Sequence, residues 1–360
     1  MRGAIVSMLS MLLLVACSAR PEPALLLPRI VAEPVGARTV AVHIVTTRTS
    51  EPDIPWAFGI DRSDAVQYGT FDISIPPVHQ TAQIEWPGSP DTADPATDFV
   101  TLRQQRMDRA AFISRVGRGE IGLYVHGFNT SFQEALYRLA QLATDAHLDG
   151  TPVLFSWPSQ AHVAAYLADR DGADFSRDAL VALLSDLTAG RSRNDPVMVL
   201  GHSMGGRLVM EALRQLKLTG RDDVLDRLEV ILAAPDIDID VFRDQIAALG
   251  KLRHPITVLI SSDDRALKVS ARLAARRARL GQVDVRDPAV QKLAVEGGLR
   301  IVDITAMPGG DSTHSRYVDL ISAQQDIAAQ NPFEGLRQAG AFVFDRAGNT
   351  LHGIGTVLAD

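Results

Sequence analysis

The chain carries V-M-V-L-G-H-S-M-G-G at Val197–Gly206, and its architecture can be argued outward from these ten residues. The opening apolar run predicts a buried strand, and the apolar spacing of Arg207–Leu216 predicts a helix. The motif Gly201-x-Ser203-x-Gly205 therefore lies at a strand–turn–helix junction, which is the setting of a nucleophile elbow. In such an elbow a serine stands at the tip of a strained turn, and glycines on either side avoid collisions with backbone. We expect Ser203 to be a nucleophile that Gly201 and Gly205 support.

Beyond residue 120, short apolar runs alternate regularly with segments of helical length. This alternation predicts βαβ units and an α/β fold, with a mostly parallel central sheet and helices on both of its faces. The predicted strands are Ile121–His126, Val153–Trp157, Val197–His202, Glu229–Ala233, Ile256–Ser261 and Arg300–Ile304.

The two ends of the domain are patterned differently. Thr39–Thr46, Phe71–Pro76 and Gln83–Trp86 are predicted to be early strands, and a helix is expected within Asp98–Val116. Near the C-terminus, two apolar runs flank the turn-like cluster D-R-A-G-N at 345–349, which predicts a β-hairpin.

Composition is that of a globular protein, with 46% hydrophobic and 22% charged residues among 360. The formal charge of −7 argues against nucleic acid as the main partner. Arg272–Arg279 holds four arginines, whose spacing fits the solvated face of a helix.

The N-terminus has the pattern of an export signal. Arg2 is followed by an apolar run, Ala4–Val15, that is too short to span a membrane. The run ends in L-V-A-C, which resembles the lipobox of bacterial lipoproteins, where the cysteine is acylated. Cys17 is the only cysteine, so no disulfide can form within the chain. The resemblance implies a lipid anchor in the bacterial cell envelope, and Ser18 after the cysteine favours the outer membrane, facing the periplasm.

These patterns divide the chain into four parts. We expect a lipoprotein signal peptide at 1–16, an acylated N-terminus and tether at 17–37, a catalytic domain at 38–332, and a C-terminal hairpin extension at 333–360.

A nucleophilic serine needs a histidine base, which a carboxylate orients. In hydrolases built on a nucleophile elbow the chain order is serine, acid, histidine. Three histidines follow Ser203. His314 lies in a loop directly after a predicted strand, whereas His254 precedes a strand and His352 lies in the tail hairpin. We expect His314 to be the base.

The acid is expected at the carboxyl end of a strand, where open α/β sheets bind ligands. Asp263 and Asp264 both follow the predicted strand Ile256–Ser261. Asp236, at the end of the preceding strand, is a further alternative, with a helix N-cap as its competing role.

An oxyanion hole needs backbone N–H groups aimed at the developing charge. Met204, at the start of the elbow helix, supplies one, and the loop after the strand Ile121–His126 supplies the other. His126-Gly127 there resembles the H-G oxyanion motif of lipases and esterases, which makes the N–H of Phe128 the second donor.

The sequence also predicts where the side chains of His202 and Trp157 lie. His202 is expected to point away from the site, on the far side of the elbow. Trp157 either lines an acyl pocket or belongs to the core.

Five segments together resemble one bacterial family of the α/β-hydrolase superfamily, a family of uncharacterised function. They are the elbow, the H-G-F-N loop, S-W-P-S at 156–159, A-P-D-I-D-I-D-V-F at 234–242 and S-S-D-D-R-A-L-K-V-S at 261–270. The resemblance implies that Asp264 is the acid.

The resulting hypothesis is a lipid-anchored serine hydrolase that cleaves small-molecule carboxylic esters through Ser203, His314 and Asp264. No cofactor is expected, and no metal, because the chain lacks H-E-x-x-H or comparable ligand spacing. The alternatives are a peptidase, amidase or acyltransferase on the same residues, and a non-catalytic envelope lipoprotein.

Overall fold

A computed structural model of the chain describes residues 20–31, 34–54, 56–117, 119–307, 312–322, 342–344 and 350–351. One sheet of 11 strands runs through the described part, in the order β11-β10-β9-β8-β7-β6-β4-β5-β1-β2-β3. Its strands are β1 Arg38–Ser50, β2 Phe58–Ile75, β3 Val100–Met107, β4 Ile121–Val125, β5 Thr151–Ser156, β6 Val197–His202, β7 Leu228–Ala233, β8 Thr257–Ile260, β9 Arg300–Asp303, β10 Phe342–Phe344 and β11 Thr350–Leu351.

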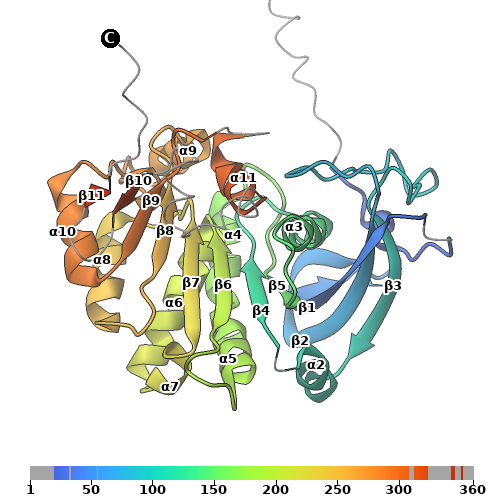
Figure 1. The fold of residues 1–360 in the computed structure, drawn as a ribbon, viewed down its shortest axis with the longest axis horizontal. Coiled ribbons are helices and arrows are strands. Elements are labelled where there is room, and N and C mark those ends of the chain that lie inside the picture. The colour runs from blue at the N-terminus through green and yellow to red at the C-terminus, as the bar shows by residue number, and fades with distance from the viewer. Residues whose placement is uncertain are drawn as a thin grey trace, which may run out of the picture.

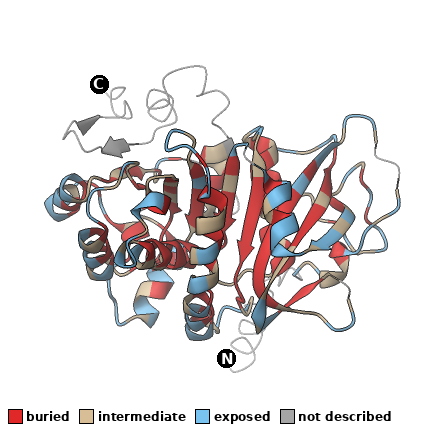
Figure 2. Ribbon diagram, turned by 90° about the horizontal axis from the view of Figure 1, so that it is seen from below, coloured by how far each residue is buried: buried red, intermediate tan, exposed pale blue. Residues whose placement is uncertain are grey.

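The sheet is parallel from β1 to β9 along this order. At one edge β2 pairs antiparallel with both β1 and β3, and at the other edge β10 pairs antiparallel with β9 and β11. The central strands are buried (Figure 2). Their continuous apolar runs are typical of parallel strands, because helices cover both faces.

Helices form a layer on each face of this sheet (Figure 1). On one face α6 packs against α4, α5 and α8, and α10 packs against α8. On the other face α3 packs against β1 and β5 and contacts α11. The helices are α2 Arg109–Val116, α3 Phe132–Asp145, α4 Tyr166–Phe175, α5 Arg177–Thr188, α6 Met204–Leu218, α7 Asp222–Leu225, α8 Ile239–Leu249, α9 Arg265–Leu273, α10 Pro288–Gly297 and α11 Arg316–Ser322, with short 3-10 turns at Pro23–Leu26, Leu280–Gln282 and Thr313–Ser315.

The predicted fold class is confirmed, and the six strands predicted beyond residue 120 form within one or two residues of their expected ends. One local prediction is wrong: Gln83–Trp86 is irregular and not a strand. The helix expected within Asp98–Val116 is confirmed as α2, and the first half of that range forms β3. The alternation of polar and apolar residues at 83–86 favours a strand, but tertiary context overrides such a local preference.

Part of the segment expected to be a tether packs against the domain. Leu25 and Leu26 are buried, and Gln133 Nε2 of α3 donates to the Pro21 carbonyl oxygen at 2.6 Å. Arg20 forms an ion pair with Glu134 at 2.6 Å. The segment Arg20–Leu26 is therefore held against the domain.

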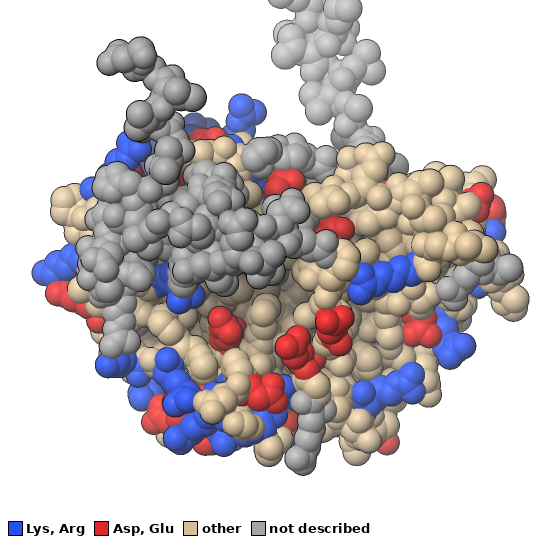
Figure 3. All heavy atoms as spheres, viewed as in Figure 1, with Lys and Arg blue, Asp and Glu red and all other residues tan. Residues whose placement is uncertain are grey.

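The surface mixes charges of both signs. On the face in Figure 3, acidic and basic side chains of the described residues lie interspersed. Within the described part of the chain, no helix has the length and apolar character needed to cross a bilayer.

Candidate active site

Ser203 occupies a strained turn between β6 and α6. Its backbone has φ 52° and ψ −117°, a conformation that non-glycine residues adopt rarely, and such strain costs of order 1–3 kcal/mol. The turn is held because the Ser203 N–H donates to the Ala233 carbonyl oxygen at 2.9 Å and the Ser203 carbonyl accepts from Gly206 and Asp236. Its side chain makes no capping bond to α6. This geometry is that of a nucleophile elbow.

The glycines around the elbow are required by close approaches. A Cβ at Gly205 would collide with the carbonyl oxygens of Val125 and His126, and one at Gly201 would lie 2.9 Å from the Gly206 Cα. At Gly127 a Cβ would lie 3.0 Å from the Ser203 Cβ. The loop after β4 therefore packs directly on the elbow.

His314 and Asp264 meet although 50 residues separate them. His314 Nδ1 lies 2.6 Å from an Asp264 carboxylate oxygen, and the carboxylate is fully buried while the imidazole is 17% exposed. The other Asp264 oxygen accepts from the Leu267 N–H at 3.0 Å as the N-cap of α9. Both oxygens are thus occupied, which fixes the carboxylate against the ring.

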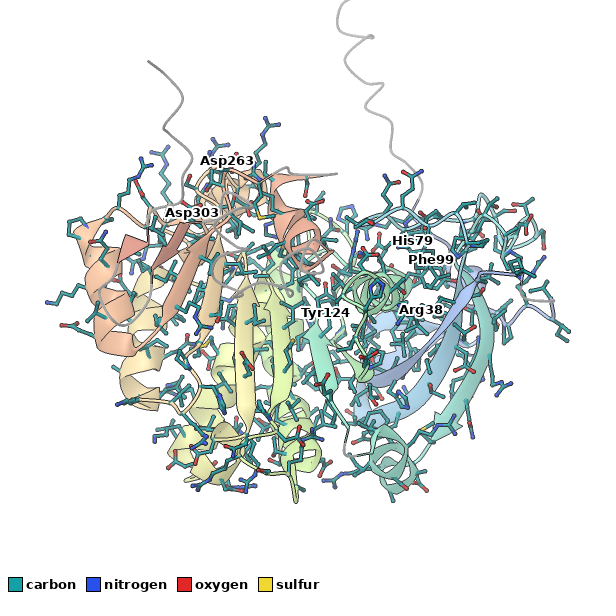
Figure 4. The ribbon with its side chains drawn as sticks, viewed as in Figure 1. Arg38, His79, Phe99, Tyr124, Asp263 and Asp303 are labelled. Carbon is teal, nitrogen blue, oxygen red and sulfur yellow. The ribbon has the colours of Figure 1, made fainter. Side chains whose placement is uncertain are left out.

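The alternative acids have other partners. Asp263 forms an ion pair with Arg316, and this hydrogen bond lowers the pKa of Asp263 to about 2. Asp263 and Asp303 both lie near the upper ends of the parallel strands in Figure 4, yet Asp263 turns to Arg316 rather than to His314.

Asp236 is buried in a polar cluster of its own. It accepts from the Tyr166 hydroxyl and the Ser270 hydroxyl, each at 2.8 Å, and Arg279 Nε lies 3.2 Å away. It is not a helix N-cap, because Asp238 caps α8. The expectation for Arg279 is also wrong: α9 ends at Leu273, and Arg279 is buried against Asp236.

His254 lies three residues before β8, at the opposite end of the strand from Asp264. Its Nε2 is 3.4 Å from the Arg193 carbonyl oxygen. His352 and Cys17 lie outside the described residues.

The predicted oxyanion donors have free N–H groups. Among the residues that the structure describes, neither the Met204 N–H nor the Phe128 N–H meets a hydrogen-bond acceptor. Met204 is the first residue of α6, where the helix dipole favours negative charge. Phe128 follows Gly127, which lies against Ser203. These two N–H groups can bind an anion formed at the elbow.

His126 is a structural residue of this loop. Burial, and then the charge of Arg48, lowers its pKa to about 3, so the ring is neutral. Its Nδ1 donates to the Gly127 carbonyl oxygen at 2.9 Å, and the ring stacks on Trp157 with centroids 4.8 Å apart. Trp157 is fully buried and donates to the His126 carbonyl oxygen at 2.8 Å, so it belongs to the core.

Sequence reasoning missed two charged residues that hold the loop. Arg48 is buried in β1 and donates to the carbonyl oxygens of Thr130 at 3.0 Å and Ser159 at 3.1 Å. Asp169 of α4 is also buried and accepts from the Asn129 N–H at 3.1 Å and the Ser159 hydroxyl at 2.6 Å. Arg48 follows the apolar part of β1 and stands among polar residues, T-T-R-T-S at 46–50, so neither it nor Asp169 carried a local signal of its role.

His202 does not point away from the site as expected. Its ring centroid lies 4.7 Å from that of His314, so it packs on the predicted base.

Within the described part of the chain, no group of three or more His, Cys, Asp or Glu side chains is arranged to hold a metal ion.

Comparison with known proteins agrees with this architecture. A family model described as "Alpha/beta hydrolase of unknown function (DUF900)" matches residues 103–329, more than half of the chain. A curated relative, "Transmembrane and coiled-coil domain-containing protein STS1" of Oryza sativa subsp. japonica, is 28% identical over 195 residues, which cover 53% of this chain and 27% of that protein. The chain therefore spans about a quarter of that relative's length.

Solved structures of esterases match the chain at low similarity. Esterase Est22 is 13% identical with a TM-score of 0.36, over 80% of this chain and 79% of its own. A fungal esterase from Rhizomucor miehei is 13% identical with a TM-score of 0.35, over 81% of this chain and 85% of its own.

Proposed function

Since the chain belongs to the alpha/beta hydrolase family of unknown function (DUF900), we propose that it is a serine hydrolase that cleaves carboxylic esters. Ser203, His314 and Asp264 are its proposed catalytic residues. The observation that carries the proposal is the 2.6 Å contact between His314 and the buried Asp264 carboxylate. The His314 ring packs on that of His202, which precedes Ser203 in its elbow.

The proposed reaction proceeds through an acyl-enzyme. The Ser203 hydroxyl oxygen attacks the ester carbon while His314 takes its proton, and the Asp264 carboxylate stabilises the imidazolium. The N–H groups of Phe128 and Met204 bind the oxyanion. The carbon–oxygen bond to the alcohol breaks as His314 returns the proton to the alcohol. Water, deprotonated by His314, then releases the acid and restores Ser203.

A fluorophosphonate probe tests the nucleophile. We expect it to label the wild-type protein and not the Ser203→Ala variant. A matched control is Ser185→Ala, because Ser185 lies on α5 and donates to the Val181 carbonyl oxygen at 2.9 Å. Absence of labelling in folded wild-type protein would overturn the proposal and favour a non-catalytic envelope protein.

Substrate assays separate the chemical alternatives. We expect turnover of 4-nitrophenyl esters of graded chain length to exceed turnover of matched peptide amides. Faster amide cleavage would assign a peptidase or amidase, and transfer of the acyl group to an added alcohol in preference to water would assign an acyltransferase.

For the location, we propose that Cys17 carries a lipid anchor in the bacterial outer membrane, with the domain in the periplasm. The L-V-A-C sequence supports this. Metabolic labelling with a radioactive fatty acid tests it: the label should enter the wild-type protein and be lost in Cys17→Ser. Labelling that persists in the variant would contradict the assignment.

A further inference from the structure

A cavity of about 660 Å³ lies beside the proposed nucleophile. Three of its lining residues, Asn129, His202 and Ser315, are chain neighbours of the proposed oxyanion donor, nucleophile and base. The volume falls within the range of small-molecule sites, roughly 300–1,000 Å³. The cavity therefore borders the elbow through residues adjacent to the proposed catalytic groups.

One wall of the cavity is apolar. Trp86, Ile84 and Leu25 contribute to it. The Trp86 indole stacks on Tyr137 of α3, with ring centroids 5.0 Å apart and planes 11° apart, which fixes the indole in place. This wall suits a hydrocarbon chain, because an aliphatic group buries its surface there without leaving a polar group unpaired.

Arg138 of α3 places a half-buried cation in the same cavity. Its guanidinium donates to the Gln141 side-chain oxygen at 2.8 Å and to the Ala82 carbonyl oxygen at 3.4 Å, both uncharged. No ion pair joins Arg138 to a carboxylate within the described part of the chain. Glu134, one turn earlier on α3, is occupied by Arg20 at 2.6 Å. Among the described residues, no carboxylate therefore forms an ion pair with Arg138.

The charge of Arg138 acts on groups that line the cavity. Burial raises the pKa of the Tyr124 and Tyr317 hydroxyls, and Arg138 opposes that rise at both. These hydroxyls lie 3.1 Å apart, and Tyr124 projects from the central strand β4 (Figure 4). Glu22, also in the lining, is exposed to solvent, where water and salt screen its charge.

We propose that the cavity binds the acyl chain of the substrate and that Arg138 binds a carboxylate at the far end of that chain. The preferred substrates are then monoesters of aliphatic dicarboxylic acids, since a guanidinium matches a carboxylate in both charge and geometry. This inference rests on the proposed ester hydrolysis for its chemistry and on the described cavity for its specificity.

A matched pair of substrates tests the specificity. The mono-4-nitrophenyl ester of adipic acid and 4-nitrophenyl hexanoate have the same chain length and differ in the terminal carboxylate. We expect wild-type kcat/KM to favour the monoester about tenfold, and Arg138→Gln to abolish that preference. Arg138→Lys should retain part of it. Monoesters of longer diacids extend the test. The chain length that gives the highest kcat/KM measures the distance from the elbow to Arg138.

The control is Arg214→Gln, because Arg214 lies on α6, is exposed and does not line the cavity. It should leave the ratio of the two kcat/KM values unchanged. If wild-type protein hydrolyses both esters without preferring the carboxylate at any chain length, or if Arg138→Gln leaves the preference intact, the assignment of Arg138 is overturned.

Binding to the Ser203→Ala variant separates this inference from the proposed reaction. Calorimetry should detect monoethyl adipate binding more tightly than ethyl hexanoate, and adding Arg138→Gln should remove the difference. If neither ester is hydrolysed while this difference is present, ester hydrolysis fails and the carboxylate site stands. If both esters are hydrolysed while the difference is absent, the carboxylate site fails and the hydrolase stands.

Discussion

His202 packs on His314, with ring centroids 4.7 Å apart and planes at 50°. Tyr317 contacts the His202 ring as well, with centroids 4.6 Å apart. Burial lowers the pKa of His202 well below its usual value, and the neighbouring His314 lowers it further. His202 is therefore a neutral ring that helps to place the proposed base.

Replacing His202 should slow the reaction without weakening substrate binding. In His202→Asn the support of the His314 ring is lost, and a misplacement of about 1 Å costs on the order of 10²-fold in rate. We expect kcat on a 4-nitrophenyl ester to fall by about that factor with little change in KM. The matched control, His147→Asn, changes an exposed histidine that lies at the end of α3. An unchanged kcat in His202→Asn would show that the ring does not position His314.

Two neighbouring aspartates should respond differently to the same substitution. Asp264→Asn removes the carboxylate that contacts His314, and we expect kcat to fall about 10⁴-fold, as in triads that lose their acid. Asp263→Asn should retain most of the activity, because that side chain binds Arg316. Steady-state kinetics on both variants tests this prediction. A larger loss of kcat in Asp263→Asn than in Asp264→Asn would assign the catalytic acid to Asp263.

Asp263 should instead affect stability in a pH-dependent way. Its pKa is about 2 in the folded protein, below the ordinary 3.8. The ionised Asp263 carboxylate therefore contributes to the free energy of unfolding above about pH 3.8, and this contribution is lost as the pH falls through about 2. Denaturant unfolding of wild-type and Asp263→Asn protein should differ at neutral pH and converge near pH 2. If the difference in unfolding free energy between the two proteins grew as the pH fell, the lowered pKa of Asp263 would be contradicted.

The elbow glycine should not accept a methyl group. A Cβ at Gly205 meets two carbonyl oxygens at the end of β4, so Gly205→Ala must displace the strand or the helix. Overpacking of this kind costs about 1–3 kcal/mol, and we expect at least that loss in the free energy of unfolding together with loss of fluorophosphonate labelling. Gly119→Ala is the control, since nothing lies within 4 Å of its Cβ position. If the two variants unfolded with equal free energy, the methyl group at position 205 would not collide with the carbonyl oxygens of Val125 and His126.

His79 should stabilise the fold most at mildly acidic pH. Burial opposes its charge, but hydrogen bonds to Asp145 at 2.9 Å and Glu85 at 2.7 Å outweigh burial and raise its pKa. Figure 4 shows His79 close to Phe99, whose ring it contacts. A raised pKa means that the stabilisation is full below the ordinary 6.5 and is lost as pH rises through the folded value.

The measurement compares His79→Gln with wild-type protein across this range. The difference in the free energy of unfolding should be largest near pH 6 and should shrink at alkaline pH. A difference that increases with pH would show that His79 is neutral in the folded protein.

Much of the fold was predictable because the governing signals are local. An apolar run followed by G-x-S-x-G and a helical pattern specifies strand, turn and helix over neighbouring residues. The strand at Gln83–Trp86 was predicted wrongly because an alternation of polar and apolar residues does not reveal whether a strand partner is available. Trp86 packs instead on Tyr137, which lies about fifty residues away in the chain.

The candidate site also has features that local sequence predicts and features that it does not. The sequence by itself determined the α/β class, the position of Ser203 in its elbow and the order in which acid and histidine must follow. Only the tertiary structure shows which of the two adjacent carboxylates contacts His314: Asp264 lies against its ring, whereas Asp263 binds Arg316. The folding of distant segments against each other likewise placed His202 on His314. It also placed Arg138 at a cavity where no carboxylate of the described residues forms an ion pair with it. Such contacts depend on packing in three dimensions, which no local pattern encodes.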